Sequence, residues 1–176
     1  MKVLFLTNLL PYPLDSGGNI KTYATLTALK RGNYDVDVVC FTEDKEKDEK
    51  NKQKLLDICH SIELIEGKLV TRENIFYMLR KAFFSLFSKY PFVVYKYKNN
   101  RMLSLIEKKL SENKYDFIYF EHLQMFLYYD LLKEKIQKNR VILDQQNCES
   151  LILCNLRRLA VADAFSSGHP ALMNGC

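Results

Sequence analysis

The sequence lacks an uninterrupted apolar run of the roughly 18 residues that a membrane-spanning helix requires. Its first residues, MKVLFLTNLLPYPLD, hold only a short apolar stretch that is interrupted by Pro11 and Pro13, which is not the pattern of a signal peptide. We therefore expect a cytoplasmic protein, and we expect any membrane contact to be peripheral, at the inner face.

The cysteines and histidines lack the spacing of a metal site or a redox pair. The five cysteines are odd in number, and no two of them form a C-x-x-C motif. We expect reduced thiols, with Cys40 as a core residue. His60, His122 and His169 do not fall into ligand spacings either, so we expect no metal site.

A strong charge of one sign is also lacking. The net charge is +5, and the lysines and arginines are spread along the 176 residues rather than gathered in one tail. This distribution favours no nucleic-acid partner, although it suits an anionic ligand or an anionic membrane surface. With 48% hydrophobic residues, the chain is apolar enough to bury a core.

Strands and helices alternate along the chain. Short apolar runs predict buried strands, and segments with helical periodicity lie between them. The expected strands cover 3–6, 35–41, 61–65, 116–120 and 140–143. The expected helices cover 17–31, 73–89, 98–113, 123–137 and 149–160, and a further short helix starts within the mixed-charge run 43–54 and is completed by 55–59. This alternation predicts an α/β fold, a Rossmann-like open parallel sheet with helices on both faces.

The loop within residues 8–23 connects the first strand with the first helix. Gly17 and Gly18 follow Asp15 and Ser16 there and precede the helical run. Backbone N–H groups at a helix start without Cβ atoms can approach an anion closely. The alternative is a plain loop capped by Ser16, in which the glycines serve only the turn. From this loop alone both interpretations stay open.

Residues 72–101, RENIFYMLRKAFFSLFSKYPFVVYKYKNNR, are rich in aromatic and basic side chains. They include seven basic residues and one acidic residue, so their net charge of +6 exceeds that of the whole chain. One interpretation is a helical cover packed on the sheet. It would use the apolar residues Phe76, Leu79, Phe83, Leu86 and Phe87. The other is an interfacial helix on an anionic leaflet, that is, peripheral membrane contact through 72–101.

In open α/β sheets, ligands bind beyond the carboxyl ends of the strands, where the strand order reverses. For the order 3-2-1-4-5, this point lies between the first and fourth strands. The loop with Gly17 and Gly18 would then face His122, which follows the fourth strand. Residues 144–149, after the fifth strand, would form the adjoining edge. Three separated stretches are thus expected at one place.

Three stretches carry a family resemblance: PYPLDSGGNIKTYATLTALKRGNYDVDVVCF, DFIYFEHLQM and VILDQQNCES, in this order. Together they resemble the N-terminal domain of a GT-B glycosyltransferase of the large retaining group, family four. The resemblance covers residue 1 to about residue 160, and the Gly-Gly opening is its most specific part. It implies sugar transfer from a nucleotide-sugar, as co-substrate and without a further cofactor, to a glycan or lipid-linked acceptor.

The resemblance also implies roles for individual residues. Gly17 and Gly18 would lie against the donor diphosphate or the acceptor, with Lys21 nearby as a compensating charge. His122 would contact the transferred sugar or the acceptor as the catalytic residue. The alternative for His122 is a structural histidine that caps the following helix.

In the later turn, Asn147 and Glu149 match the binding residues of the family pattern. Gln146 departs from it, because many relatives have histidine there and an amide cannot act as a base. A proton-transfer role at this position is therefore in doubt.

The larger departure from the family is length. Complete GT-B enzymes have a second Rossmann-like domain that grips the nucleotide, and these 176 residues hold no second domain of that kind. We expect an acceptor-side domain at 1–160 and an irregular tail or truncation point at 161–176. Transfer activity would then require a C-terminal domain or a partner subunit.

Two other functions stay open. One is a nucleotide- or dinucleotide-binding oxidoreductase domain with Glu43 or Asp44 as the ribose-binding acid, although the G-x-G-x-x-G fingerprint is absent. The other is a non-catalytic binding subunit of a split transferase, which the missing donor half suggests.

Overall fold

The computed structural model describes residues 1–67, 75–136 and 139–145. The chain divides into two units, Met1–Asp144 and Gln145–Cys176, and the fold is that of the first unit. The predicted boundary near residue 160 lies outside the described residues and stays a prediction.

The first unit is built on a five-stranded sheet in which every neighbouring pair of strands is parallel. The strands are β1 (Lys2–Leu9), β2 (Asp35–Thr42), β3 (Ser61–Glu66), β4 (Phe117–Glu121) and β5 (Arg140–Asp144). Their order across the sheet is β3-β2-β1-β4-β5. The predicted Rossmann-like α/β fold is confirmed, and so is the expected reversal of strand order between β1 and β4.

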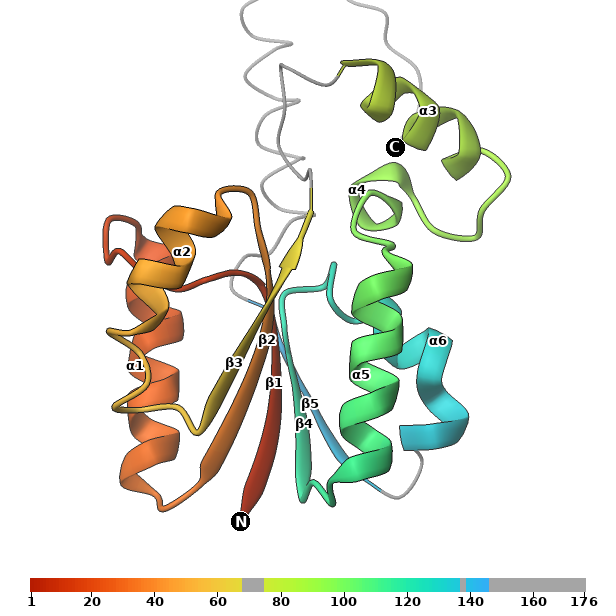
Figure 1. The fold of residues 1–176 in the computed structure, drawn as a ribbon. Helices are drawn as coiled ribbons and strands as arrows, with labels where there is room; N and C mark the ends of the chain where they lie inside the picture. The colour runs from red at the N-terminus through yellow and green to blue at the C-terminus, as the bar shows by residue number, and fades with distance from the viewer. Residues whose placement is uncertain (68–74, 137–138, 146–176) are drawn as a thin grey trace, which may run out of the picture. The chain divides into compact units, whose positions relative to one another are not determined.

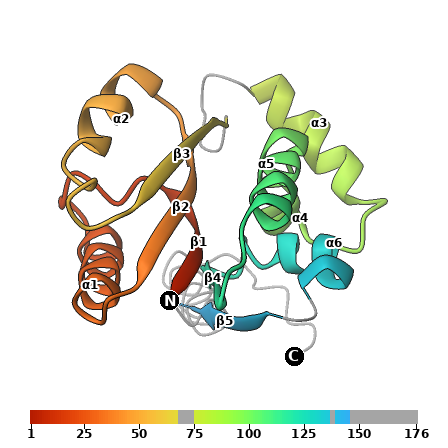
Figure 2. The same ribbon diagram turned by 60° about the horizontal axis from the view of Figure 1, so that its bottom comes forward.

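Helices form the connections that parallel strands require. They are α1 (Gly17–Arg31), α2 (Lys45–Lys52), α3 (Ile75–Ser85), α4 (Phe92–Tyr95), α5 (Asn100–Glu112) and α6 (Leu127–Ile136). Helices α1 and α2 lie on one face of the sheet, and α5 and α6 lie on the other (Figure 1). The view in Figure 2 shows the same two layers from the side of the strand starts. Among the described residues, no helix combines the length and the apolar character needed to cross a bilayer.

Alternate side chains of each strand build two separate cores. Val3 and Phe5 of β1 belong to the core that includes α1, whereas Leu4 and Leu6 belong to the core that includes α5. All four are almost inaccessible to solvent. Cys40 is a free, buried thiol in the first of these cores, as predicted. A strand covered on both faces explains the continuous apolar run in the sequence.

Helix α1 has the bounds that the sequence predicted, but its exit uses a different residue. The backbone enters the left-handed region at Asn33, with φ 58°, and not at Gly32, with φ −78°. A Cβ atom at Gly32 would lie 2.9 Å from Cε2 of Tyr34. The close approach of that ring, rather than a positive φ, accounts for the glycine.

Two helices between β2 and α5 differ from the prediction. The expected helix start within 43–54 agrees with α2, but the expected completion of that helix at 55–59 is wrong, because α2 ends at Lys52 and residues 53–58 form turns. Asp44 explains where α2 begins, since its side chain accepts a hydrogen bond from the backbone of Lys47. The short helix α4 was not predicted. It begins after Pro91, a residue that ends the preceding helix pattern but suits a new helix start.

The interpretation of residues 73–89 as a cover packed on the sheet is wrong. The five apolar residues on which it depended are 58–85% exposed. They are Phe76, Leu79, Phe83, Leu86 and Phe87. None of these described residues belongs to either core. Periodicity located the helix correctly, but it could not tell which of its faces would be packed.

Candidate functional site

The loop that leads from β1 into α1 lies at the carboxyl edge of the sheet (Figure 1). Ser16 caps the helix, because its Oγ accepts a hydrogen bond from the Asn19 backbone N–H at 3.2 Å. The Asn19 side chain donates to Pro13 O at 2.8 Å and to Asp15 Oδ1 at 3.0 Å. The first turn of α1 therefore starts from a hydrogen-bonded loop and presents its backbone N–H groups in a fixed direction.

Gly17 is the first residue of α1 and is exposed. A Cβ atom built on it would have no heavy atom within 4 Å, and its φ does not fall in the left-handed region. Neither crowding nor backbone conformation in the described protein therefore requires glycine at this position. The described residues therefore leave the space beside the first turn open to a ligand.

Lys21 lies one turn further along α1 and forms an ion pair with Asp144 at the end of β5. Lys21 Nζ is 2.6 Å from Asp144 Oδ1, and the Tyr119 hydroxyl donates to Asp144 Oδ2 at 2.6 Å. The Lys21 side chain is 41% exposed and that of Asp144 is 21% exposed, so solvent reaches the pair. The sequence analysis assigned Lys21 to a bound ligand, but in the structure its ammonium group pairs with the Asp144 carboxylate. A bound anion would have to share Lys21 with Asp144.

Hydrogen bonding decides the charge state of this pair. Burial raises the pKa of Asp144, but hydrogen bonds from Lys21 and Tyr119 outweigh it and hold that pKa below the usual value. Burial, followed by the hydrogen bond to Asp144, raises the pKa of Tyr119. Near neutral pH the carboxyl is therefore ionised and the phenol is protonated, so Asp144 balances the charge of Lys21.

A second contact joins α1 to the end of β4. Glu121 is fully buried, and Thr22 Oγ1 donates to its Oε1 at 2.5 Å. The same hydroxyl lies 2.9 Å from Gly18 O in the preceding turn. A buried carboxyl group needs hydrogen-bond partners of this kind, because a polar group without a partner is costly away from water. The contact fixes α1 across the point where the strand order reverses.

His122 follows Glu121 directly and has a left-handed backbone, with φ 71°. Its N–H donates to Asp144 O at 2.9 Å, and its carbonyl accepts from the Met125 N–H at 3.1 Å. A positive φ is uncommon for a residue with a Cβ atom, and such residues gather at functional sites. The bond to Met125 equally fits the structural alternative, in which His122 starts the following turns.

The expected convergence of three stretches is present for the residues that the structure describes. The Lys21–Asp144 contact joins residues 123 positions apart, and the Thr22–Glu121 contact joins residues 99 positions apart. Gly17, Gly18, Lys21 and His122 are therefore gathered around the ends of β4 and β5. Their roles stay predictions. Asn147 and Glu149, with their neighbour Gln146, lie outside the described residues.

Three polar residues of this place were missed as site residues: Thr22, Tyr119 and Glu121. Glu121 had a signal in the sequence, because an acidic residue closes an otherwise apolar strand. Tyr119 looked like an ordinary strand residue, and nothing distinguished Thr22 from the other threonines of α1. Only the tertiary structure shows that Glu121 contacts Thr22 of α1 and that Tyr119 shares Asp144 with Lys21 of the same helix.

Asp44, one of the two acids proposed for ribose binding, has a structural role instead. Asp44 accepts a hydrogen bond from the Lys47 backbone at 3.1 Å and so serves as the cap of α2. The connection from Leu9 to Gly17 is also longer than the tight turn of a dinucleotide fingerprint. Within the described ranges, no three His, Cys, Asp or Glu side chains are grouped as metal ligands.

Comparison with known proteins adds little. No model of a protein family matches the chain, and no curated protein matches it. Among solved structures, the chain is similar to the N-terminal domain of a trehalose-6-phosphate phosphatase from Candida albicans. The sequence identity is 15% and the TM-score is 0.44, and the match covers 81% of this chain and 32% of that chain. A similarity of this size carries no argument about function.

Proposed function

We propose that this chain is the N-terminal, acceptor-side domain of a glycosyltransferase that moves a sugar from a nucleotide-sugar to a glycan or lipid-linked acceptor. The observation that supports this most is the meeting of the α1 amino terminus with the ends of β4 and β5. It occurs at the reversal of strand order, where ligands of open α/β sheets bind. The GT-B resemblance requires the same three segments at the same edge.

In this proposal the first turn of α1 holds an anionic group of the donor or acceptor. The backbone N–H groups of Gly17 and Gly18 point out of the amino-terminal end of α1, where the helix dipole favours negative charge. The open space beside Gly17 gives that group access. Lys21 divides its charge between Asp144 and the ligand, and His122 contacts the transferred sugar or the acceptor.

The proposed reaction needs groups that stabilise the departing diphosphate as well as groups that bind the acceptor. The anomeric C–O bond to the donor diphosphate breaks, a C–O bond to an acceptor hydroxyl forms, and that hydroxyl loses its proton. Negative charge develops on the departing diphosphate, so the rate depends on positive groups placed around it. In our proposal this chain positions the acceptor, and a C-terminal domain or partner subunit stabilises the leaving group.

Amide chemical-shift mapping of the isotope-labelled chain tests the proposal. UDP-glucose and GDP-mannose serve as donor probes, with NAD as the control for the oxidoreductase alternative. In our proposal the first turn of α1 contacts the donor diphosphate, while the main contacts with the nucleotide belong to the C-terminal domain or partner subunit. We therefore expect weak but saturable shifts centred on Gly17, Gly18 and His122 with a nucleotide-sugar, and no saturable shifts with NAD. Saturable shifts with NAD alone, or nucleotide-sugar shifts confined to the opposite edge of the sheet, would contradict the proposal.

A further inference from the structure

The outer face of α3 and the residues just after it expose large apolar side chains. Phe76, Leu79 and Phe83 are spaced by three and four residues and so share one face of the helix. Their exposed fractions are 85%, 60% and 58%. The complete set, which we call the α3 surface, is Phe76, Leu79, Phe83, Phe84, Leu86 and Phe87. Contiguous apolar exposure of this kind marks an interaction site.

The polarity of α3 is the reverse of that of an ordinary surface helix. Its inner side carries Tyr77 and Lys81, which are half-buried, while the phenylalanines face outward. Lys81 Nζ donates to Lys98 O at 2.6 Å and lies 5.7 Å from the Tyr77 ring centroid. It also lies 5.5 Å from the ring of Tyr95. Polar contacts thus hold the inner side, and they leave the apolar side outward.

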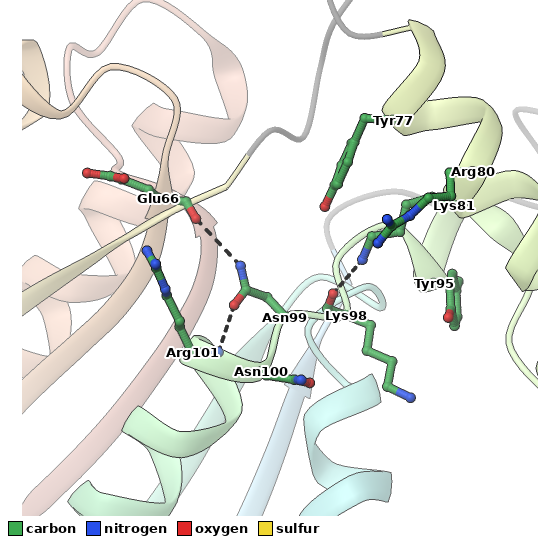
Figure 3. A pocket seen from close by; sticks show the side chains of 9 residues that line it. All are labelled: Glu66, Tyr77, Arg80, Lys81, Tyr95, Lys98, Asn99, Asn100 and Arg101. Atoms are coloured by element: carbon green, nitrogen blue, oxygen red, sulfur yellow. Dashed lines mark hydrogen bonds between the residues drawn. The ribbon is translucent and has the colours of Figure 1, made fainter.

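Helix α3 also contributes Tyr77, Arg80 and Lys81 to a pocket of about 510 Å³, and four of the nine residues that line this pocket are basic. Figure 3 shows Arg80 and Lys81 from α3, together with Lys98 and Arg101 from the segment that enters α5. We call these four residues the basic pocket. Asn99 caps α5 there, so the positive end of that helix dipole adds to the charge.

Among the described residues, the basic pocket has little compensating negative charge of its own. Glu66 is the acid in its lining, and its carboxylate lies 3.3 Å from Lys45 Nζ, outside the pocket. Burial lowers the pKa of Lys81, and the like charges of Lys98 and Arg80 lower it further. Lys81, Lys98 and Arg80 are therefore close enough to repel one another, and the described lining residues hold fewer acids than cations, so an anion would relieve the repulsion.

We propose that the α3 surface and the basic pocket form a docking site for an anionic membrane surface. The apolar side chains enter the interfacial region of the bilayer, and the basic pocket binds the phosphate groups of the lipids. Charge complementarity favours lipid over a second copy of this chain, because pairing two copies here would bring like-charged pockets together. The inference stands independently of the proposed transferase function.

Flotation of the full chain with lipid vesicles tests the inference. We expect the protein to float with vesicles of phosphatidylcholine mixed with phosphatidylglycerol. Binding to phosphatidylcholine alone should be at least about tenfold weaker, since the electrostatic contribution is then missing. Added salt should weaken binding to the anionic vesicles in the same direction.

Two pairs of variants separate the apolar and the charged contributions. The double variant Phe83→Ser with Phe87→Ser should lower vesicle binding by about tenfold or more. Leu56→Ser is its control and should not lower binding, because Leu56 is an exposed apolar residue outside α3. Arg80→Glu should lower binding by about fivefold or more, and Lys54→Glu is its control with the same change of net charge. Thermal unfolding monitored by circular dichroism checks that each variant is folded.

Several outcomes would overturn the inference. One is equal binding to neutral and anionic vesicles, and another is equal loss in the variants and their controls. A third is failure to float together with self-association that Phe83→Ser abolishes in sedimentation, which would assign the α3 surface to a contact between copies. Failure to float by a folded monomer would also reject it.

Discussion

Two polar clusters, at opposite edges of the same sheet, are built from similar residues. At the carboxyl edge, Asp144 accepts from Lys21 and Tyr119. At the amino edge, Asp37 accepts from Tyr115 and lies 3.2 Å from Lys2 Nζ. Each cluster therefore combines a carboxylate, a lysine and a tyrosine, and residue type alone does not distinguish them.

Their surroundings differ. The Asp37 side chain is 3% exposed, against 21% for Asp144. Asp37 is also contacted by Ser61 Oγ at 2.5 Å and His60 Nδ1 at 2.8 Å, so its oxygens are fully used. Around Asp144 the cluster remains accessible and lies beside the open first turn of α1. We interpret the Asp37 cluster as a stabilising one and the Asp144 cluster as the place for a ligand.

The largest effect on stability is expected at Asp37. Asp37→Ala removes the buried carboxylate that pairs with Lys2 and is hydrogen-bonded by Ser61, His60 and Tyr115. The free energy of unfolding should therefore fall by about 3–5 kcal/mol. Asp144→Ala breaks a partly exposed pair and should cost only about 1 kcal/mol. Urea unfolding followed by circular dichroism measures both. Equal losses would remove the distinction between the clusters.

The same contrast should appear in the pH dependence. Burial raises the pKa of Asp37, but hydrogen bonds from Ser61, His60, Tyr115 and Lys2 lower it far below its usual value. Stability from a depressed carboxyl pKa is present above the unfolded-state pKa of about 3.9 and is lost as the pH falls below it.

Asp37→Asn should therefore flatten the decrease in stability below about pH 4 more than Asp144→Asn does. Unfolding free energies measured in a pH series give the two slopes. A steeper acid dependence retained in the Asp37→Asn protein would show that other carboxyls control it.

A smaller effect is expected for the contact that fixes α1 to β4. Thr22→Val keeps the side-chain shape but removes the hydroxyl that donates to the buried Glu121, so it should cost about 1–3 kcal/mol. Thr27→Val is the control on the same helix, because the hydrogen bond described for its hydroxyl goes to Tyr23 O in the preceding turn. Equal costs for the two variants would mean that the contact with Glu121 contributes little.

The smallest effect on stability, and the most informative about function, is expected at Gly17. Gly17→Ala should leave the protein as stable or raise its stability by about 0.4–1 kcal/mol, because the site is open and the unfolded chain loses freedom. Gly67→Ala is the control, since its Cβ would lie 2.6 Å from Cδ1 of the buried Phe41. Thermal unfolding compares the two.

Binding of the nucleotide-sugar probes should respond to Gly17→Ala even though stability does not fall. We expect Gly17→Ala to weaken it, because the added methyl group stands between the helix start and the ligand. If Gly17→Ala binds the probes as well as the unchanged protein does, Gly17 serves only the turn of the loop and does not contact the ligand.

Prediction from the sequence succeeded where local pattern is sufficient. The bounds of α1 followed from Ser16, the helical periodicity and the basic residues at its end. It failed where a face had to be chosen, as for Phe83 and its neighbours, because exposed and buried apolar stripes look alike in sequence. It also missed the buried Glu121 as a partner of Thr22.

The sequence by itself determined the succession of strands and helices, and with it the parallel sheet and the edge at which Gly17 and His122 lie. Those features follow from local apolar pattern and from the need of parallel strands for long connections. Only the tertiary structure decided that Lys21 meets Asp144, that Lys2 meets Asp37, and that the phenylalanines of α3 face outward. Such pairings depend on strand register and side-chain direction between distant segments, which no local pattern contains.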